Sequence, residues 1–202
     1  MIYQLTLINN KEMGETMSDT KEKLSAVTVT LHWVVGLSII SMIAVGVYMT
    51  DYEVHELYPI HKSVGMLLFV VILCRVIWRI KHGWPEAASN YKAWEHTLSK
   101  IVHWLLIIAT IILPVSGMLM SGLGGYGLAI FGWELLAATP NPDEVGKMIP
   151  INGALAGAAH ETHEIAGKVL FVAIVLHLCG ALKHHFVDKD GTLRRMLGKR
   201  IS

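Results

Sequence analysis

Charged side chains are scarce in this chain of 202 residues, at 16% of the total, whereas hydrophobic residues make up 53%. Soluble globular domains carry about 25% charged residues. The composition therefore excludes an ordinary soluble domain and favours a protein with several membrane-spanning segments. The formal net charge is only +1, so no overall electrostatic field points to nucleic acid as a partner.

Cysteine is nearly absent as well. The chain has two, both in apolar segments, and we expect no disulfide bond between them within the bilayer near the cytoplasmic side. The amino-terminal region lacks the long apolar stretch and the small-residue cleavage site of a secretory signal, so we expect no cleaved signal peptide. Residues 1–24 are polar, and we expect them to form a disordered extension.

Four apolar segments are each long enough to cross about 30 Å of hydrocarbon. They cover residues 29–50, 60–80, 98–121 and 161–186. The sequence thus predicts an all-α membrane protein in which residues 25–188 form a bundle of four transmembrane helices.

Lysine and arginine are distributed unevenly among the connections between these spans. The loop 51–59 has none and the loop 122–160 has only Lys147, whereas the loop 81–97 and the tail 189–202 are basic. Positive residues collect on the cytoplasmic side of a membrane protein. Both termini and the basic loop are therefore predicted to be cytoplasmic, and the long loop is predicted to lie outside.

The outer loop contains one apolar stretch, residues 128–138, with the sequence LAIFGWELLAA. Such a stretch can lie in the membrane surface as a short amphipathic helix, and we expect a helix there. The residues TPNPDE that follow are typical of a turn.

Four histidines in or at the start of the spans are each followed by a glycine about one helical turn later. A histidine in lipid is costly and indicates a functional site. A glycine three or four residues further on lies on the same helix face and leaves space beside the imidazole for a flat macrocycle. The pairs are His32 with Gly36, His61 with Gly65, His163 with Gly167, and His177 with Gly180.

The spacing of these histidines predicts two haems at different depths. His163 and His177 are fourteen residues apart on one span, so they lie within about 40° of one helix face and roughly 21 Å apart along it. His61 starts the second span at the outer side, level with His163, and His32 starts the first span at the inner side, level with His177. We therefore predict an outer haem held by His61 and His163 and an inner haem held by His32 and His177. Iron with two imidazole ligands has no open position for oxygen, so such haems carry electrons.

The same histidines are compatible with two roles that need no haem. A single histidine in a membrane helix can be a hydrogen-bonding core residue. The second possible role is a non-haem metal site, but such a site needs ligands gathered in one place, and these four are spread over two depths. Covalent attachment of haem is disfavoured, because the chain has no CxxCH motif.

Two further residues are expected near the inner haem. His103 starts the third span at the inner side but has no glycine one turn later, so we expect it beside the haem without binding the iron. Arg75 lies fourteen residues after His61, near the inner haem. It can pair with a haem propionate, since a buried charge needs a partner, or extend towards the membrane surface near Arg79.

Lys62 and Lys168 flank the predicted outer haem. They can neutralise propionates or attract an anionic electron donor, or they can serve only as anchors at the membrane surface. His184 and His185 follow the last inner ligand, at the inner surface. There they can give a hydrogen bond or a proton to a quinone head group, or they can simply lie at the interface.

Four stretches around the histidines have distinctive sequences: LHW at 31–33, PIHKSVG at 59–65, HETHEIAG at 160–167 and LHLCGALKHHFVDKDGTLRRML at 176–197. They resemble the bacterial cytochrome b561 family, and the likeness runs from about residue 24 to residue 200. The resemblance implies a four-helix bundle in the bacterial inner (plasma) membrane that binds two b haems. It assigns the axial ligands to His32, His61, His163 and His177, in agreement with the spacing.

The resemblance also implies electron transfer between the periplasmic face and the ubiquinone pool. One branch of the family resembles a superoxide oxidase, which passes an electron from periplasmic superoxide to ubiquinone, with the quinone near the position of His184. The alternative is a haem-bearing membrane anchor that transfers electrons for a periplasmic oxidoreductase such as a hydrogenase or formate dehydrogenase. The outer loop is the most divergent region, so the electron donor is the least transferable feature.

Overall fold

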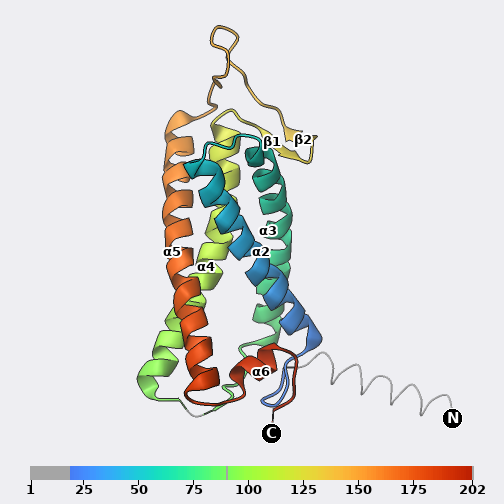
Figure 1. The fold of residues 1–202 in the computed structure, drawn as a ribbon. Helices are drawn as coiled ribbons and strands as arrows, with labels where there is room; N and C mark the ends of the chain where they lie inside the picture. The colour runs from blue at the N-terminus through green and yellow to red at the C-terminus, as the bar shows by residue number, and fades with distance from the viewer. Residues whose placement is uncertain (1–18, 90, 202) are drawn as a thin grey trace, which may run out of the picture.

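The computed structural model describes residues 19–89 and 91–201. Four long α-helices account for most of them (Figure 1): α2 (Ala26–Asp51), α3 (Leu57–His82), α4 (Ala93–Leu123) and α5 (Gly153–Phe186). Each is long and apolar enough to cross a membrane, which confirms the four predicted spans. The disorder expected of residues 1–24 falls mainly on residues 1–18, outside the described residues.

Each helix begins before the apolar segment that predicted it, and polar caps set two of these starts. Ser25 caps α2, where its side chain accepts a hydrogen bond from the backbone N–H of Thr28 at 3.2 Å. Asn152 caps α5 by accepting from the backbone N–H of Leu155 at 3.1 Å. Because such caps satisfy N–H groups that have no partner inside the helix, α5 begins eight residues before the predicted span.

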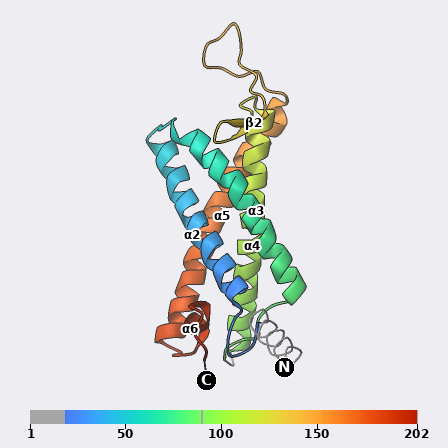
Figure 2. The same cartoon turned by 90° about the vertical axis from the view of Figure 1, so that its right-hand side faces the viewer.

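The four helices run alternately in opposite directions, so both ends of the described chain lie at the same end of the bundle (Figure 1, Figure 2). We call this the tail end, and we call the opposite end, where α4 connects to α5, the hairpin end. α4 packs along α5, and α3 contacts both α2 and α4. All four helices contribute to a common core of Val35, Ile39, Leu68, Ile72, Ala109 and Leu170.

The expected surface helix at residues 128–138 is wrong. This stretch forms an antiparallel hairpin of β1 (Leu128–Ile130) and β2 (Trp133–Leu136). The turn between the strands explains the difference, because Phe131 and Gly132 both have positive φ, at 48° and 88°. A two-residue turn with two positive φ angles matches the twist of a hairpin.

The tail end is held together by polar contacts between segments that are far apart in the sequence. A short helix, α6 (Thr192–Met196), lies there and includes the buried Arg195. The guanidinium of Arg195 donates to the backbone carbonyls of Lys21 at 2.7 Å and Glu86 at 2.9 Å. Residues 19–24, which the sequence assigns to the extension, are therefore tied to the bundle.

Candidate functional site

Four of the histidines lie in two pairs, one towards each end of the bundle. His61 from α3 and His163 from α5 form the hairpin-end pair, with ring centres 6.4 Å apart. His32 from α2 and His177 from α5 form the tail-end pair, with ring centres 6.0 Å apart. The structure thus brings together the two pairs that the spacing predicts.

Each pair has the separation expected of two imidazoles that hold one metal ion between them. A metal–nitrogen bond to histidine is about 2 Å long and the ring centre lies about 1 Å beyond the nitrogen, so opposed ligands place their ring centres about 6 Å apart. Two neutral nitrogens from separate helices are also a donor set that suits six-coordinate haem iron. The residues present therefore fit the prosthetic group that the sequence implies.

The hairpin-end pair is supported by the neighbouring helices. Nδ1 of His163 donates to the backbone carbonyl of Leu113 at 2.8 Å and lies 3.2 Å from Oγ of Ser116. A carbonyl partner for one ring nitrogen leaves the other nitrogen as the metal ligand. His61 differs, because its Nδ1 is buried and has no hydrogen-bond partner within the described part of the chain.

The tail-end pair has a more polar setting. Nη2 of Arg75 lies 3.1 Å from Nδ1 of His32. Because a guanidinium can only donate, Nδ1 of His32 is the acceptor and the ring proton is on Nε2. The ring centre of His103 lies 5.2 Å from that of His177. The structure thus places both Arg75 and His103 beside this pair, where the sequence predicts them.

The glycines one turn after the histidines differ in their surroundings. A Cβ added to Gly36 or Gly180, next to the tail-end pair, would meet nothing within 4 Å. A Cβ added to Gly65 or Gly167, next to the hairpin-end pair, would make ordinary van der Waals contacts at 3.5 Å and 3.9 Å. The open space that the sequence predicts beside the imidazoles is therefore clearest at the tail end.

The sequence does not predict Gly117, the glycine that lies closest to a paired histidine. A Cβ on Gly117 of α4 would lie 3.1 Å from Cε1 of His163, which is tighter than most real contacts of a Cβ. Gly117 precedes His163 by 46 residues. No periodicity within one helix can reveal a contact between two helices, so the sequence carried no signal for it.

Comparison with known proteins identifies the family of this chain. The family model described as prokaryotic cytochrome b561 matches residues 23–199. Cytochrome b561 homolog 2 of Escherichia coli strain K12 is 31% identical over 192 residues, which cover 93% of this chain and 97% of that protein. This chain belongs to the prokaryotic cytochrome b561 family.

Two other relatives of this cytochrome b561 are more distant but are matched over nearly their full length. Cytochrome b561 homolog 1 of Escherichia coli strain K12 is 22% identical over 189 residues, covering 88% of this chain and 98% of that protein. A protein of Yersinia pestis named probable superoxide oxidase CybB is 25% identical over 183 residues, with 89% and 98% covered. As a family member, the chain is a multi-pass bacterial membrane protein that transfers electrons and contains b-type haem.

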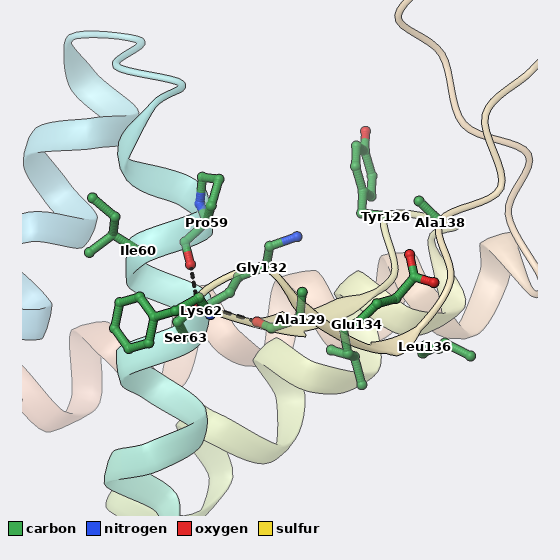
Figure 3. A pocket seen from close by; sticks show the side chains of 12 residues that line it. Pro59, Ile60, Lys62, Ser63, Tyr126, Ala129, Gly132, Glu134, Leu136 and Ala138 are labelled. Atoms are coloured by element: carbon green, nitrogen blue, oxygen red, sulfur yellow. Dashed lines mark hydrogen bonds between the residues drawn. The ribbon is translucent and has the colours of Figure 1, made fainter.

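The two predicted lysines of this cytochrome b561 have different surroundings. Lys62 lines a cavity of about 470 Å³ between the hairpin and the start of α3, together with Glu134 (Figure 3). Its ammonium group donates to Oγ of Ser121 at 3.1 Å, and among the described residues it forms no ion pair with a carboxylate. Lys168 is exposed and forms an ion pair with Glu164 at 2.6 Å. Lys62 is therefore the stronger candidate for attracting an anion.

His184 lies in a polar cluster at the tail end. Its Nδ1 is 2.8 Å from a carboxylate oxygen of Asp188 and 3.1 Å from one of Asp190, and its ring centre is 4.5 Å from that of Tyr91. The ammonium of Lys183 also contacts Asp188 at 2.8 Å and holds the pKa of that carboxyl below its ordinary value. Burial raises the pKa of Tyr91. The cluster brings several groups that can hold or release a proton to one place.

Proposed function

We propose that this cytochrome b561 binds two b haems, one between His61 and His163 and one between His32 and His177, and moves electrons between the two faces of the membrane. The main support is that two imidazole pairs, each with ring centres about 6 Å apart, share α5 at two depths. Haem iron that alternates between its ferric and ferrous forms supplies the one-electron chemistry.

The side chains around the pairs have separate tasks in this proposal. Binding of iron through Nε2 of His32 requires the ring proton on Nδ1, so Arg75 has to turn away from that nitrogen. Arg75 is then free to pair with a haem propionate. His103 stays beside the tail-end haem without binding iron. Room for the macrocycle comes from Gly36 and Gly180 at the tail end, where an added Cβ would meet nothing within 4 Å. We assign the same task to Gly65 and Gly167 at the hairpin end, where Met42 and Leu113 lie in van der Waals contact and have to move aside.

We place the protein in the bacterial inner membrane, with the tail end at the cytoplasmic face and the hairpin end at the outer face. The uneven distribution of Lys and Arg between the two ends supports this orientation, because positive residues collect on the cytoplasmic side. The loop between α4 and α5 carries a single basic residue of the lysine or arginine type, Lys147. The chain beyond α5 carries Lys189, Arg194, Arg195, Lys199 and Arg200.

Superoxide is our candidate for the electron donor at the outer face. The relative from Yersinia pestis carries the name of a probable superoxide oxidase. A positive charge in a cavity attracts a small anion, and Lys62 lines such a cavity directly after His61 in the sequence. The carboxylate of Glu134 lines the same cavity and opposes this attraction, so the ammonium of Lys62 acts on an anion that approaches close to it. The charge of Lys168 is balanced by Glu164, so its contribution is expected to be smaller.

Ubiquinone is our candidate for the acceptor, bound at the tail end near His184. Reduction of a quinone to a quinol takes up two electrons and two protons. His184, Asp188 and Asp190 lie together, and they can provide a hydrogen bond to a quinone carbonyl and a route for protons.

The donor is tested by mixing a pulse of superoxide with the purified, oxidised protein and following the Soret and α bands. We expect the bands to show reduction faster than superoxide dismutates, and superoxide dismutase should abolish that reduction. Addition of a short-chain ubiquinone should then reoxidise the protein. Bands that do not change, or that change equally in the presence of the dismutase, would contradict superoxide as donor.

One observation favours a second function, a haem-bearing membrane anchor for a periplasmic oxidoreductase such as a hydrogenase or formate dehydrogenase. The outer loop exposes the apolar side chains of Val145, Ile149 and Ile151, which a partner subunit can cover. Co-purification of a large periplasmic subunit with the wild-type chain, and its loss in Val145→Asp, would support the anchor. A chain that purifies alone and oxidises superoxide would exclude it.

A further inference from the structure

Three groups of α4 meet the imidazole of His163, although none of them is near it in the sequence. The carbonyl oxygen of Leu113 accepts a hydrogen bond from Nδ1 of His163 at 2.8 Å. Oγ of Ser116, a buried residue, lies 3.2 Å from the same nitrogen. Gly117 presents its bare backbone to the ring, where an added Cβ would lie 3.1 Å from Cε1 and 3.3 Å from Nδ1.

Gly117 explains why the imidazole can reach that carbonyl. In an α-helix, side chains point back towards the amino terminus, so the side chain of residue 117 would extend over the preceding turn, which contains Leu113. A carbonyl oxygen has two lone pairs, so it can accept a second hydrogen bond from the side of the helix. The hydroxyl of Ser116 has one proton and makes its shorter contact, 2.7 Å, with the carbonyl of Ile112 rather than with that of Leu113 at 3.0 Å, which leaves the Leu113 oxygen to His163. The absence of a side chain at 117 leaves that approach open to His163.

The contact determines which nitrogen of His163 can bind metal. Because a carbonyl only accepts, Nδ1 carries the ring proton and Nε2 keeps its lone pair. Ligand histidines typically make such a bond, which fixes the ring and makes it a stronger donor. The other paired histidines described so far lack such a bond to a carbonyl. His61 has a buried Nδ1 without a partner in the described residues, and Nδ1 of His32 faces the guanidinium of Arg75.

We propose that Gly117 is a positioning residue for the hairpin-end haem: together with the Leu113 carbonyl and Ser116 it orients His163 and strengthens it as an axial ligand. This inference rests on the proposed function, in which His163 binds haem iron. With this contact, the hairpin-end site holds haem more tightly than the same site would without it. The contact also favours ferric over ferrous iron, because a stronger donor stabilises the higher charge on the metal.

The test is the substitution Gly117→Ala, with Gly157→Ala on α5 as the matched control. A Cβ at 157 would meet nothing within 4 Å, and both changes raise helix propensity by a similar amount. The readout is the rate at which each haem transfers from the purified protein to apomyoglobin, together with the electron paramagnetic resonance signals of the two ferric haems. Loss of a supporting hydrogen bond typically weakens a metal site about 10- to 100-fold.

We expect Gly117→Ala to release one haem about 10- to 100-fold faster than wild type and to shift one of the two resonance signals, while the other haem and the control stay unchanged. Ser116→Ala removes only a hydroxyl and should shift the same signal to a smaller extent. If Gly117→Ala does not accumulate in the cell, the result for Ser116→Ala decides whether α4 positions His163.

Unchanged release rates and signals in both variants would overturn the positioning role. A wild-type protein without haem between His61 and His163 would instead refute the proposed function, so the two failures can be told apart.

Discussion

The two histidine pairs have the same kind of ligand but different surroundings. At the hairpin end, Nδ1 of His163 donates to a neutral backbone carbonyl of α4. At the tail end, His32 faces the guanidinium of Arg75 at 3.1 Å, and His103 adds a third imidazole next to His177. The hairpin-end pair is oriented by a backbone carbonyl of a neighbouring helix. The tail-end pair lies beside the positive charge of the half-buried Arg75.

The difference indicates a direction for the electron. A nearby cation stabilises the reduced state of a haem, which carries one more negative charge. A carbonyl that accepts from an axial imidazole has the opposite effect, because it strengthens the donor and stabilises the oxidised iron. We therefore expect the tail-end haem to have the higher reduction potential, which favours electron flow from the hairpin end to the tail end.

Removing one ligand from each pair should have the largest effect. We expect His163→Ala and His177→Ala each to lose one of two haems and to keep the other, because each histidine serves only one pair. The haem-to-protein ratio of the purified variants measures this. If His163→Ala kept both haems, another residue, such as the exposed His160, would be the ligand.

Removing the charge of Arg75 should change one reduction potential only. A unit charge about 7 Å away at an effective dielectric of about 20 contributes about 2 kcal/mol, or on the order of 90 mV for one electron. We expect Arg75→Gln to lower the midpoint potential of the tail-end haem by up to this amount. A redox titration followed at the α bands measures it, and an equal shift of both haems would argue against a local effect of Arg75.

The two lysines sharpen the comparison at the outer face. We expect Lys62→Gln to slow reduction by superoxide several-fold, with a weaker dependence on salt than wild type. The reason is that the charge of Lys62, which pairs with no carboxylate among residues 19–89 and 91–201, lies next to the cavity and attracts the anion. Lys168→Gln is the matched control and should change the rate less, because Lys168 is paired with Glu164. Equal effects of the two substitutions would contradict a specific role for Lys62.

The smallest effect is expected at the polar contacts of the tail end. Burial by itself would raise the pKa of Asp19, but hydrogen bonds from Ser25 and Thr28 and the charge of Arg79 hold it below its ordinary value. The stabilisation from this ionised carboxylate is thus present above its ordinary pKa and is lost as the pH falls.

We expect Asp19→Asn to reduce stability by about 1 kcal/mol at neutral pH. Thermal unfolding in detergent measures the difference, which should shrink below about pH 4. A difference that is constant with pH would show that the charge of Asp19 has no part in it.

The four spans and the shared face of His163 and His177 could be predicted from the sequence because both follow from properties of single helices. An apolar segment of sufficient length predicts a span whatever packs beside it. Fourteen residues correspond to almost four turns, so His163 and His177 share a face in any α-helix. The positions of Lys and Arg predict the direction of each span, and the directions predict which histidines lie at the same depth.

The hairpin and the contact to Gly117 could not be predicted, because neither follows from helical periodicity. The stretch 128–138 is short, apolar and rich in leucine and alanine, and such runs do not distinguish helix from strand. The turn at Phe131 and Gly132 determines the outcome. The contact between Gly117 and His163 exists only because α4 packs along α5.

The number of haems per chain tests the central claim most directly. Protein purified after expression with ample haem supply is denatured in alkaline pyridine, and the b-type haemochrome is compared with the protein concentration from quantitative amino-acid analysis. Two imidazole pairs predict two b haems per polypeptide. A colourless protein, or one haem per chain under these conditions, would contradict the arrangement of two haems stacked along α5.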